Sequence, residues 1–296
     1  MKKREAVYKK LMQSYRVCTV VGVVLLTALQ AFSYGKLQQQ SYAFDFLTFK
    51  GTAFSNKTTL EIFSQISTNS LQFVKFKEGF FASYELSLGF YNASGAKIHG
   101  ASYIDTIKVK SFAEIDKPRP PQLIRFHVDL DPGFYQAKIN LKDLETLEII
   151  SFDRDLDIPD YRKSELQFSD LQIASSITYS NEKSVLVKNN QKIIPNVTRV
   201  VGRDLKVLYI YSEVYNLHYN ANGMNKNFIA TFTIRDQKGH ELKTISNSKE
   251  KPGSVCSLSI GIPVHDLQAG TYNLILNVKD LDSGQIQQKS TQFFVI

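Results

Sequence analysis

The residues that could perform catalysis or bind a metal are scattered along the chain. It contains neither a Gly-x-Ser-x-Gly nucleophile elbow nor a His-Glu-x-x-His metal motif. The best-placed histidine is His127, which shares one face of an alternating segment with Arg125 and Asp129. Alternation places all three on the polar outer face of a strand. The sequence therefore predicts no catalytic residue, no metal ligand and no cofactor. The other histidines stand singly: His99, His218, His240 and His265.

The densest acidic run consists of Asp153, Asp155, Asp157 and Asp160. Clustered carboxylate oxygens suit calcium, which is a hard cation. The run does not fit an EF-hand loop, because Ile158 stands where the turn glycine belongs and Ser164 where the bidentate glutamate belongs. Two interpretations stay open: a calcium ion that stiffens a domain junction, or a solvated linker with basic neighbours.

Three tyrosines are the candidate partner-binding residues. Tyr209, Tyr211 and Tyr215 alternate along one segment, and its other face is aliphatic. If the aliphatic face is core, the tyrosines are exposed and could stack on a sugar ring or anchor a protein partner. The alternative is an aromatic ladder covered by the neighbouring domain or by a loop.

The elements that must position these residues are strands. Nearly every apolar segment alternates with period two, as in residues 80–90, and turn residues separate the segments. No helical period persists beyond the N-terminal segment. We therefore expect an all-β fold of two tandem immunoglobulin-like or fibronectin-type β-sandwich domains, over residues 37–158 and 165–296.

An internal repeat supports two domains. Residues 130–144 (LDPGFYQAKINLKDL) recur 137 positions later as residues 267–281 (LQAGTYNLILNVKDL). In each copy a leucine, a turn glycine and a tyrosine lead into an alternating strand. This arrangement resembles the tyrosine corner of immunoglobulin-like sandwiches, in which the hydroxyl binds the backbone upstream. Tyr135 and Tyr272 are therefore expected to be structural.

The N-terminal segment has the pattern of a secretory signal. Six basic residues precede an uncharged run from Val17 to Leu29, and small residues favour cleavage before Tyr34, although an uncleaved anchor is the alternative. Residues 1–33 hold six of the 36 Lys and Arg and one of the 28 Asp and Glu, so the net charge falls from +8 to +3 on their removal. Without a basic stripe, nucleic acid is not an expected partner. Cys256 is then the only cysteine, which excludes an intramolecular disulfide and favours a small buried side chain.

Three stretches resemble the N-terminal half of the GWxTD domain-containing proteins, which are exported bacterial proteins of poorly defined function. They are residues 70–98 (SLQFVKFKEGFFASYELSLGFYNASGAKI), 168–177 (FSDLQIASSI) and 186–217 (LVKNNQKIIPNVTRVVGRDLKVLYIYSEVYNL). The chain has no tryptophan, so the motif that names the family is absent. The resemblance implies a paired β-sandwich from an extracytoplasmic protein of the type found in Bacteroidetes and Chlorobi.

These observations favour a non-enzymatic protein exported to the periplasm or cell envelope. It would act as an interaction or assembly module with an envelope protein partner, and sheet edges would offer strand addition. Membrane contact is expected only through an uncleaved N-terminal segment. The alternatives are a glycan-binding protein that uses the Tyr209 face and a hydrolase whose site the sequence does not reveal.

Overall fold

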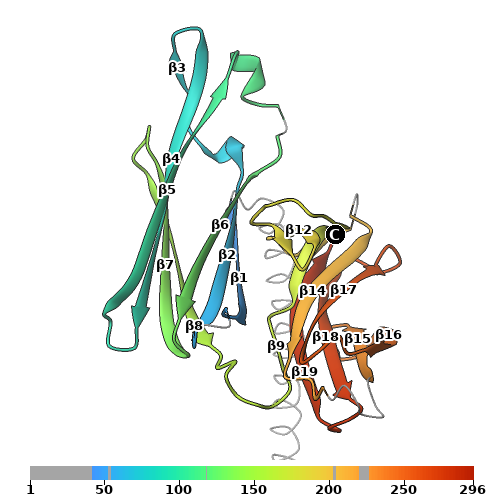
Figure 1. The fold of residues 1–296 in the computed structure, drawn as a ribbon. Helices are drawn as coiled ribbons and strands as arrows, with labels where there is room; N and C mark the ends of the chain where they lie inside the picture. The colour runs from blue at the N-terminus through green and yellow to red at the C-terminus, as the bar shows by residue number, and fades with distance from the viewer. Residues whose placement is uncertain (1–41, 53–54, 118, 203–204, 220–226) are drawn as a thin grey trace, which may run out of the picture. The chain divides into compact units, whose positions relative to one another are not determined.

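A computed structural model describes residues 42–296, apart from residues 53–54, 118, 203–204 and 220–226 (Figure 1). The expected signal segment, together with Cys18, lies outside the described residues. Tyr42–Ile296 forms one compact unit. Over the described ranges, the structure contains no helix with the length and hydropathy needed to span a membrane.

The first sandwich consists of two antiparallel sheets. Sheet A has the strand order β1 (Tyr42–Lys50), β2 (Thr58–Ile66), β6 (Gln122–Leu130). Sheet B has the order β5 (Lys97–Val109), β4 (Gly79–Asn92), β7 (Gly133–Asp143), β8 (Ile149–Ile158), and the short strand β3 (Val74–Phe76) pairs with the start of β4. Two short 3-10 helices, η1 (Thr68–Ser70) and η2 (Phe112–Glu114), lie in the connections.

The core of this sandwich follows from the alternation in each strand. In β4 the even-numbered residues from Ala82 to Phe90 point inward and are buried, whereas the odd-numbered residues from Phe81 to Ser87 remain partly exposed. They meet inward residues of sheet A, such as Leu60 and Ile62. The apolar face of each strand therefore fills the space between sheets A and B.

The second sandwich repeats this arrangement. Sheet C has the order β11 (Val187–Lys188), β12 (Gln191–Pro195), β10 (Gln172–Tyr179), β14 (Val207–Tyr215), β17 (Val255–Pro263), with β9 (Gln167–Phe168) also paired to β14. Sheet D has the order β13 (Val200–Val201), β19 (Ile286–Val295), β18 (Gly270–Asp280), β15 (Asn227–Arg235), β16 (Glu241–Glu250). All pairings are antiparallel except that of β13 with β19. A separate apolar core fills the space between sheets C and D.

The all-β sandwich prediction is confirmed, and the repeat is visible in the strand order. Strands β1-β2-β6 and β5-β4-β7-β8 correspond to β10-β14-β17 and β16-β15-β18-β19. Both predicted tyrosine corners are present. The Tyr135 hydroxyl donates to the Asp131 carbonyl at 3.0 Å, and the Tyr272 hydroxyl donates to the Gln268 carbonyl at 2.7 Å.

Sheet A is unusual because both of its faces are buried. Its inner face covers the first core, and its outer face packs on sheet C. Four residues from each side form this third apolar cluster: Ala43, Leu47, Phe49 and Phe63 from sheet A, and Ala174, Ile193, Val197 and Tyr211 from the second sandwich. The contact between the sandwiches is therefore a core in its own right.

Candidate interaction surface

The predicted partner-binding tyrosines lie in the contact between the sandwiches. Tyr211 and Tyr215 are 0% and 1% exposed, and Tyr209 is partly buried beside the third cluster. The prediction that they are exposed is therefore wrong for Tyr211 and Tyr215, because sheet A covers this face of β14. The structure matches the alternative, an aromatic ladder under the neighbouring domain.

The tyrosine hydroxyls belong to a polar network around Glu213. Tyr211 and Tyr215 each donate to the Glu213 carboxylate at 2.7 Å, and the backbone N–H of Lys50 donates to the Tyr215 hydroxyl at 3.0 Å. Burial raises the pKa of both tyrosines far above the usual range, and the Glu213 charge adds to this shift. Both phenols have internal hydrogen-bond partners, and the bond from Lys50 to Tyr215 links the two sandwiches.

Glu61 carries a second polar cluster in the same contact. Its buried carboxylate pairs with Arg125 at 2.7 Å and with Lys188, from the second sandwich, at 2.5 Å. Burial lowers the pKa of Lys188, and the Glu61 charge opposes this shift. The Lys188 ammonium lies 3.6 Å from the ring centroid of Phe49. Two cations thus share one buried anion across the contact.

The proposed outer-face trio from β6 does not converge on a site. Arg125 is held by Glu61, while Asp129 accepts a hydrogen bond from the Thr59 hydroxyl at 2.6 Å. His127 is exposed. As the alternation indicates, all three lie on the face opposite the first core.

The carboxylates of the acidic run do not meet at one point either. Asp153, Asp155 and Asp157 are spaced along β8 instead of forming a loop, so successive carboxylates are about 7 Å apart along the strand. Asp160 binds the Arg162 guanidinium at 2.7 Å, and these hydrogen bonds lower the pKa of Asp160 to about 2. Within the described ranges there is no group of three or more His, Cys, Asp or Glu side chains that could hold a metal ion.

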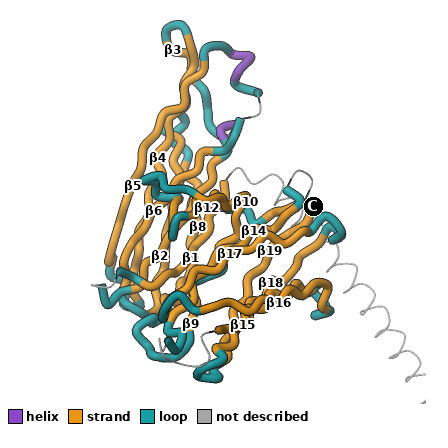
Figure 2. The backbone as a smooth tube through the Cα atoms, turned by 45° about the vertical axis from the view of Figure 1, so that its right-hand side comes forward, coloured by secondary structure: helices purple, strands orange, loops and turns teal. Residues whose placement is uncertain are grey.

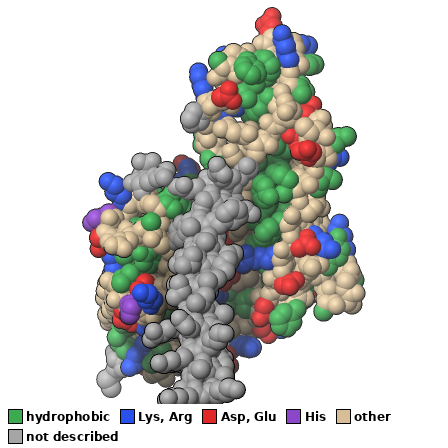
Figure 3. All heavy atoms as spheres, turned by 180° about the vertical axis from the view of Figure 1, so that it is seen from behind, with side chains coloured by type: hydrophobic (Ala, Val, Ile, Leu, Met, Phe, Trp, Pro, Cys, Tyr) green, Lys and Arg blue, Asp and Glu red, His purple; other side chains and the backbone are tan. Residues whose placement is uncertain are grey.

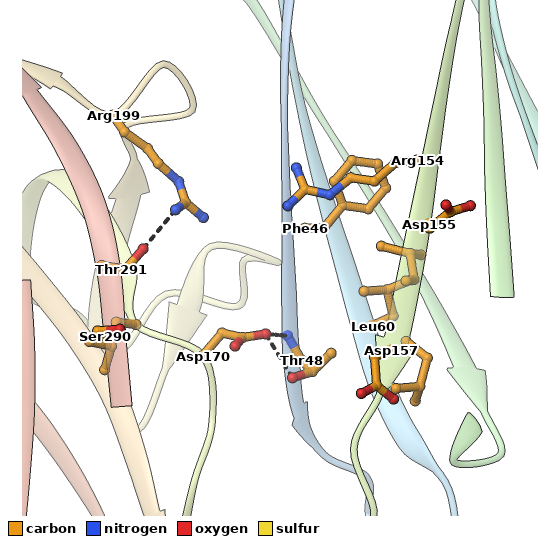
Figure 4. A pocket seen from close by; sticks show the side chains of 13 residues that line it. Phe46, Thr48, Leu60, Arg154, Asp155, Asp157, Asp170, Arg199, Ser290 and Thr291 are labelled. Atoms are coloured by element: carbon orange, nitrogen blue, oxygen red, sulfur yellow. Dashed lines mark hydrogen bonds between the residues drawn. The ribbon is translucent and has the colours of Figure 1, made fainter. Parts of the chain in front are cut away.

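A pocket of about 260 Å³ lies between the sandwiches (Figure 4). On the side of the first sandwich, the Arg154 guanidinium lies over Phe46, 5.2 Å from the ring centroid. On the other side, Arg199 donates to the Thr291 hydroxyl at 2.7 Å and pairs with Asp45 at 2.5 Å. Asp45 is fully buried, and burial raises its pKa although Arg199 opposes the shift.

A second set of polar contacts in the same pocket links the two sandwiches. Asp170 accepts hydrogen bonds from the backbone N–H and the hydroxyl of Thr48, at 2.6 and 2.7 Å, and pairs with Lys289 at 2.7 Å. The lining includes five charged side chains, Arg154, Asp155, Asp157, Asp170 and Arg199, whereas ligand pockets are mainly apolar with a few convergent polar groups. Asp170 and Arg199 are held by contacts with the opposite sandwich. This pocket therefore belongs to the contact between the sandwiches.

Cys256 is only partly buried, whereas the sequence favours a buried side chain. Its side chain is half-buried against the second core, and burial raises the pKa of its thiol. A raised pKa leaves less thiolate at neutral pH and hence lowers reactivity.

The candidate interaction surface lies instead on sheet B, along β5. This strand is 13 residues long and, among the described strands, pairs only with β4, so it forms an edge of the sheet. Its exposed residues include Ile98, Tyr103 and Ile104, with Ile104 62% exposed. An unpaired edge with apolar side chains is a template for another strand.

A pocket of about 490 Å³ lies beside this edge, at the end of the sheet that carries β3. Phe76 and Phe81 form one wall, with their rings edge to face at 5.8 Å and 89°. The lining also includes Lys108, Ser83 and Thr106, and the hydroxyls of Ser83 and Thr106 are 3.0 Å apart. Figure 2 shows β3, the ends of β4 and β5, and both short helices at this end of the first sandwich.

The sequence contains one signal for the doubly buried strand β1 and another for the exposed phenylalanines near β3. Period-two alternation alone reveals neither. Residues 43–49 (AFDFLTF) form a nearly continuous apolar run, which is typical of a strand buried on both faces. Residues 73–81 (FVKFKEGFF) interleave phenylalanine with lysine around a turn, so that one face of the hairpin cannot be purely core.

The fold defines an all-β protein of paired sandwiches. No family model and no curated protein matches the chain. Among solved structures, the chain is similar to the β-glucuronidase of Parabacteroides merdae in two crystal structures, one with glycerol in its active site, at 11% identity and TM-scores of 0.25 and 0.26. The likeness covers 79% of this chain but only 28% and 27% of the glucuronidase chains. TM-scores this low support no inference about the present chain.

Proposed function

We propose that this chain is a non-enzymatic, exported envelope protein that acts as an interaction or assembly module. The observation that carries the proposal is the exposed edge strand β5. The basic and apolar N-terminal pattern and the resemblance to the GWxTD domain-containing proteins support an extracytoplasmic location, in the periplasm or cell envelope.

The second sandwich provides an internal comparison for β5. Its equivalent edge strand, β16, carries Glu241, Lys243, Lys249 and Glu250 along ten residues. Charged residues protect an edge against pairing with another chain. In contrast, β5 exposes Tyr103 and Ile104 in mid-strand. β5 also carries Lys97, Asp105 and Lys108, and β16 exposes Leu242, so the two edges differ chiefly in the adjacent exposed Tyr103 and Ile104 of β5.

Two features limit where a partner strand can pair. The β4–β5 register shifts between Phe90 and Tyr91, so Ile98 is the extra residue of a bulge. Asp105 lies opposite the buried Tyr84, on the inward face of the strand. The regular part of the edge therefore runs from His99 to Lys108, long enough for strand addition, in which the main chain supplies affinity and side chains supply specificity.

The glycan-binding alternative depended on a tyrosine face that the structure does not expose. It required exposed tyrosines on the Tyr209 face, and Tyr211 and Tyr215 are buried and bound to Glu213. The interaction module remains the function that the geometry supports best.

Site-specific photo-crosslinking in the native host tests this proposal. A photoreactive side chain placed at Ser102 or Ile104 of β5 is expected to give a discrete protein adduct, because both side chains are exposed at the edge. Adding Ile104→Lys to the Ser102 probe should abolish the adduct by protecting the edge.

The matched control places the same probe at Thr244 and Ser246, which are exposed on β16. These positions should give no adduct. Equal labelling from β5 and β16, or no protein adduct from β5 in cells, would contradict the proposal.

A further inference from the structure

We propose that the β3 end of the first sandwich docks on an anionic lipid surface. The docking surface, called the hairpin tip here, consists of residues 73–81 and 108–119 apart from Pro118, from β3, the start of β4, the end of β5 and η2. The inference goes beyond the proposed function, because it uses a surface next to the β5 edge and leaves that edge free for a protein partner.

The apolar part of the hairpin tip consists of exposed phenylalanines. Phe76 is 60% exposed and Phe112 is 68% exposed. Each rests on a partly buried ring beneath it: Phe76 on Phe81, and Phe112 on Phe80 at a centroid distance of 5.9 Å. Phe80 faces the first core and Phe81 faces outward, so the two exposed rings flank opposite faces of the β4 end. Entry of this end of the sheet into a lipid interface would bring both rings into contact with lipid.

Lysines surround these rings. Lys75, Lys77, Lys108, Lys110 and Lys117 are all exposed, and none forms an ion pair with another described residue. Residues 73–81 and 108–119 contain six Lys or Arg and three Asp or Glu. Their net charge of +3 equals that of the whole chain after residue 33, so the rest of that chain is neutral. Figure 3 shows hydrophobic, basic and some acidic side chains together at this end of the sandwich.

The turn keeps one of these lysines in a costly conformation. Lys77 has φ of +50°, in the left-handed region that favours glycine or asparagine. It lies between Phe76 and Gly79 in a tight hairpin, and its ammonium is 5.3 Å from the Phe76 ring centroid. A cation therefore occupies the outermost turn although a glycine would fit the backbone with less strain.

The combination favours lipid over a protein partner. Lysine is depleted in protein–protein interfaces, whereas interfacial membrane binding combines phenylalanine with lysine on the surrounding polar face. Lysine stems can lie along apolar surface while the ammonium groups reach the headgroups. An anionic lipid surface offers an apolar interface for the phenylalanine rings of the hairpin tip and negative headgroups for its lysines.

Vesicle co-sedimentation tests the proposal. The protein is the chain from Tyr34 to Ile296, which contains the whole compact unit but lacks the apolar N-terminal run that could itself bind vesicles. We expect it to bind vesicles of mixed phosphatidylcholine and phosphatidylglycerol, to bind pure phosphatidylcholine much less, and to dissociate as salt is raised.

Variants assign the binding to the hairpin tip. Phe76→Ser and Phe112→Ser should each weaken partitioning about tenfold, through lost apolar burial in the interface. Lys75→Glu and Lys110→Glu should each weaken it at least about fivefold. Matched controls are Phe134→Ser and Tyr179→Ser, at rings 71% and 75% exposed elsewhere, and Lys183→Glu; these should change nothing. Circular dichroism and thermal unfolding confirm that each variant is folded.

Lack of binding to anionic vesicles, or equal binding by the hairpin-tip variants and the wild type, would overturn the inference. If a protein adduct forms at β5 in cells but the purified chain does not bind vesicles, the lipid inference is wrong and the proposed function is still supported. Vesicle binding by the purified chain without any β5 adduct in cells would support the lipid inference and contradict the proposed function.

Discussion

Asp143 and Asp280 occupy the same place in the two sandwiches, at the ends of β7 and β18. Each carboxylate accepts backbone N–H groups from the turn that follows and one from a distant segment, at Gln72 and His218 respectively. Only Asp280 also binds a buried cation, Lys251, at 2.6 Å. Burial disfavours the Asp280 charge, but hydrogen bonds from Lys251 and from backbone N–H groups outweigh it and lower the pKa of Asp280.

At the residue scale we therefore predict that Asp280→Asn destabilises the protein much more than Asp143→Asn. Loss of the carboxylate charge that pairs with the buried Lys251 costs about 3–5 kcal/mol, whereas weakened neutral hydrogen bonds cost about 1–2 kcal/mol. Urea unfolding at neutral pH measures both. Because folding lowers the pKa of Asp280, its contribution is present above about pH 4, the unfolded value, and is lost as pH falls through the folded pKa. A wild-type to Asp280→Asn difference that grows at acid pH would contradict this account.

At the scale of elements, the β7–β8 and β18–β19 hairpins close on turns of the same backbone geometry, but a leucine in the first turn stands where the second has a glycine. Leu147 lies at φ of +63° and Gly284, 137 positions later, at φ of +72°. In both, the residue donates its N–H to the aspartate carbonyl at 2.9 Å. The first hairpin thus holds a leucine in a conformation that only glycine adopts freely.

We predict that Leu147→Gly stabilises the first sandwich by about 0.5–1 kcal/mol. Relief of the left-handed strain, about 1–2 kcal/mol, exceeds the added backbone entropy of glycine, and the Leu147 side chain is 63% exposed and so loses little burial. The reciprocal control, Gly284→Ala, should destabilise by a similar amount, since a Cβ there meets no neighbouring atom and only backbone strain is added. Thermal unfolding of both variants measures these stability changes, and destabilisation by Leu147→Gly would contradict the prediction.

At the scale of the whole described unit, the sandwiches share a core instead of being joined only by a linker. The third apolar cluster, the Glu213 network and the Glu61 ion pairs all cross the contact. Tyr161, in the connection itself, is buried edge to face against Tyr215 at 5.2 Å. Such a contact should couple the unfolding of the two sandwiches.

Glu61→Gln tests this coupling. It leaves Arg125 and the buried Lys188 without their shared anion, which should cost about 3–5 kcal/mol. Calorimetry should show one transition in the wild type and separated or broadened transitions in the variant. Adding Lys188→Met to Glu61→Gln should restore part of the loss, because the uncompensated buried cation is gone. A change below about 1 kcal/mol in Glu61→Gln would show that the pairs are not coupled to folding.

The sequence predicts the strands and the tyrosine corners well, because alternation and a turn glycine before a tyrosine are local signals. It predicts the Tyr209 face poorly for a physical reason. Period-two alternation separates two faces but does not tell whether the second meets water or another sheet. The run at residues 43–49 is typical of a strand buried on both faces, but its partner in sheet C depends on how the second sandwich packs against the first. The exposure of Phe76 and Phe112 likewise depends on where sheet A ends, which is a tertiary property.

The two buried faces of sheet A have a consequence for how the protein is made. Synthesis runs from the N-terminus, so strands β1–β8 can pair before Ala174, Ile193 and Tyr211 exist. Until then Leu47, Phe49 and Phe63 form an uncovered apolar surface on an otherwise finished sandwich. Transiently exposed surface of this kind is where nascent chains aggregate or bind chaperones. The C-terminal half thus covers this apolar surface, and we expect a chain that stops after Ile158 to leave it exposed and to aggregate.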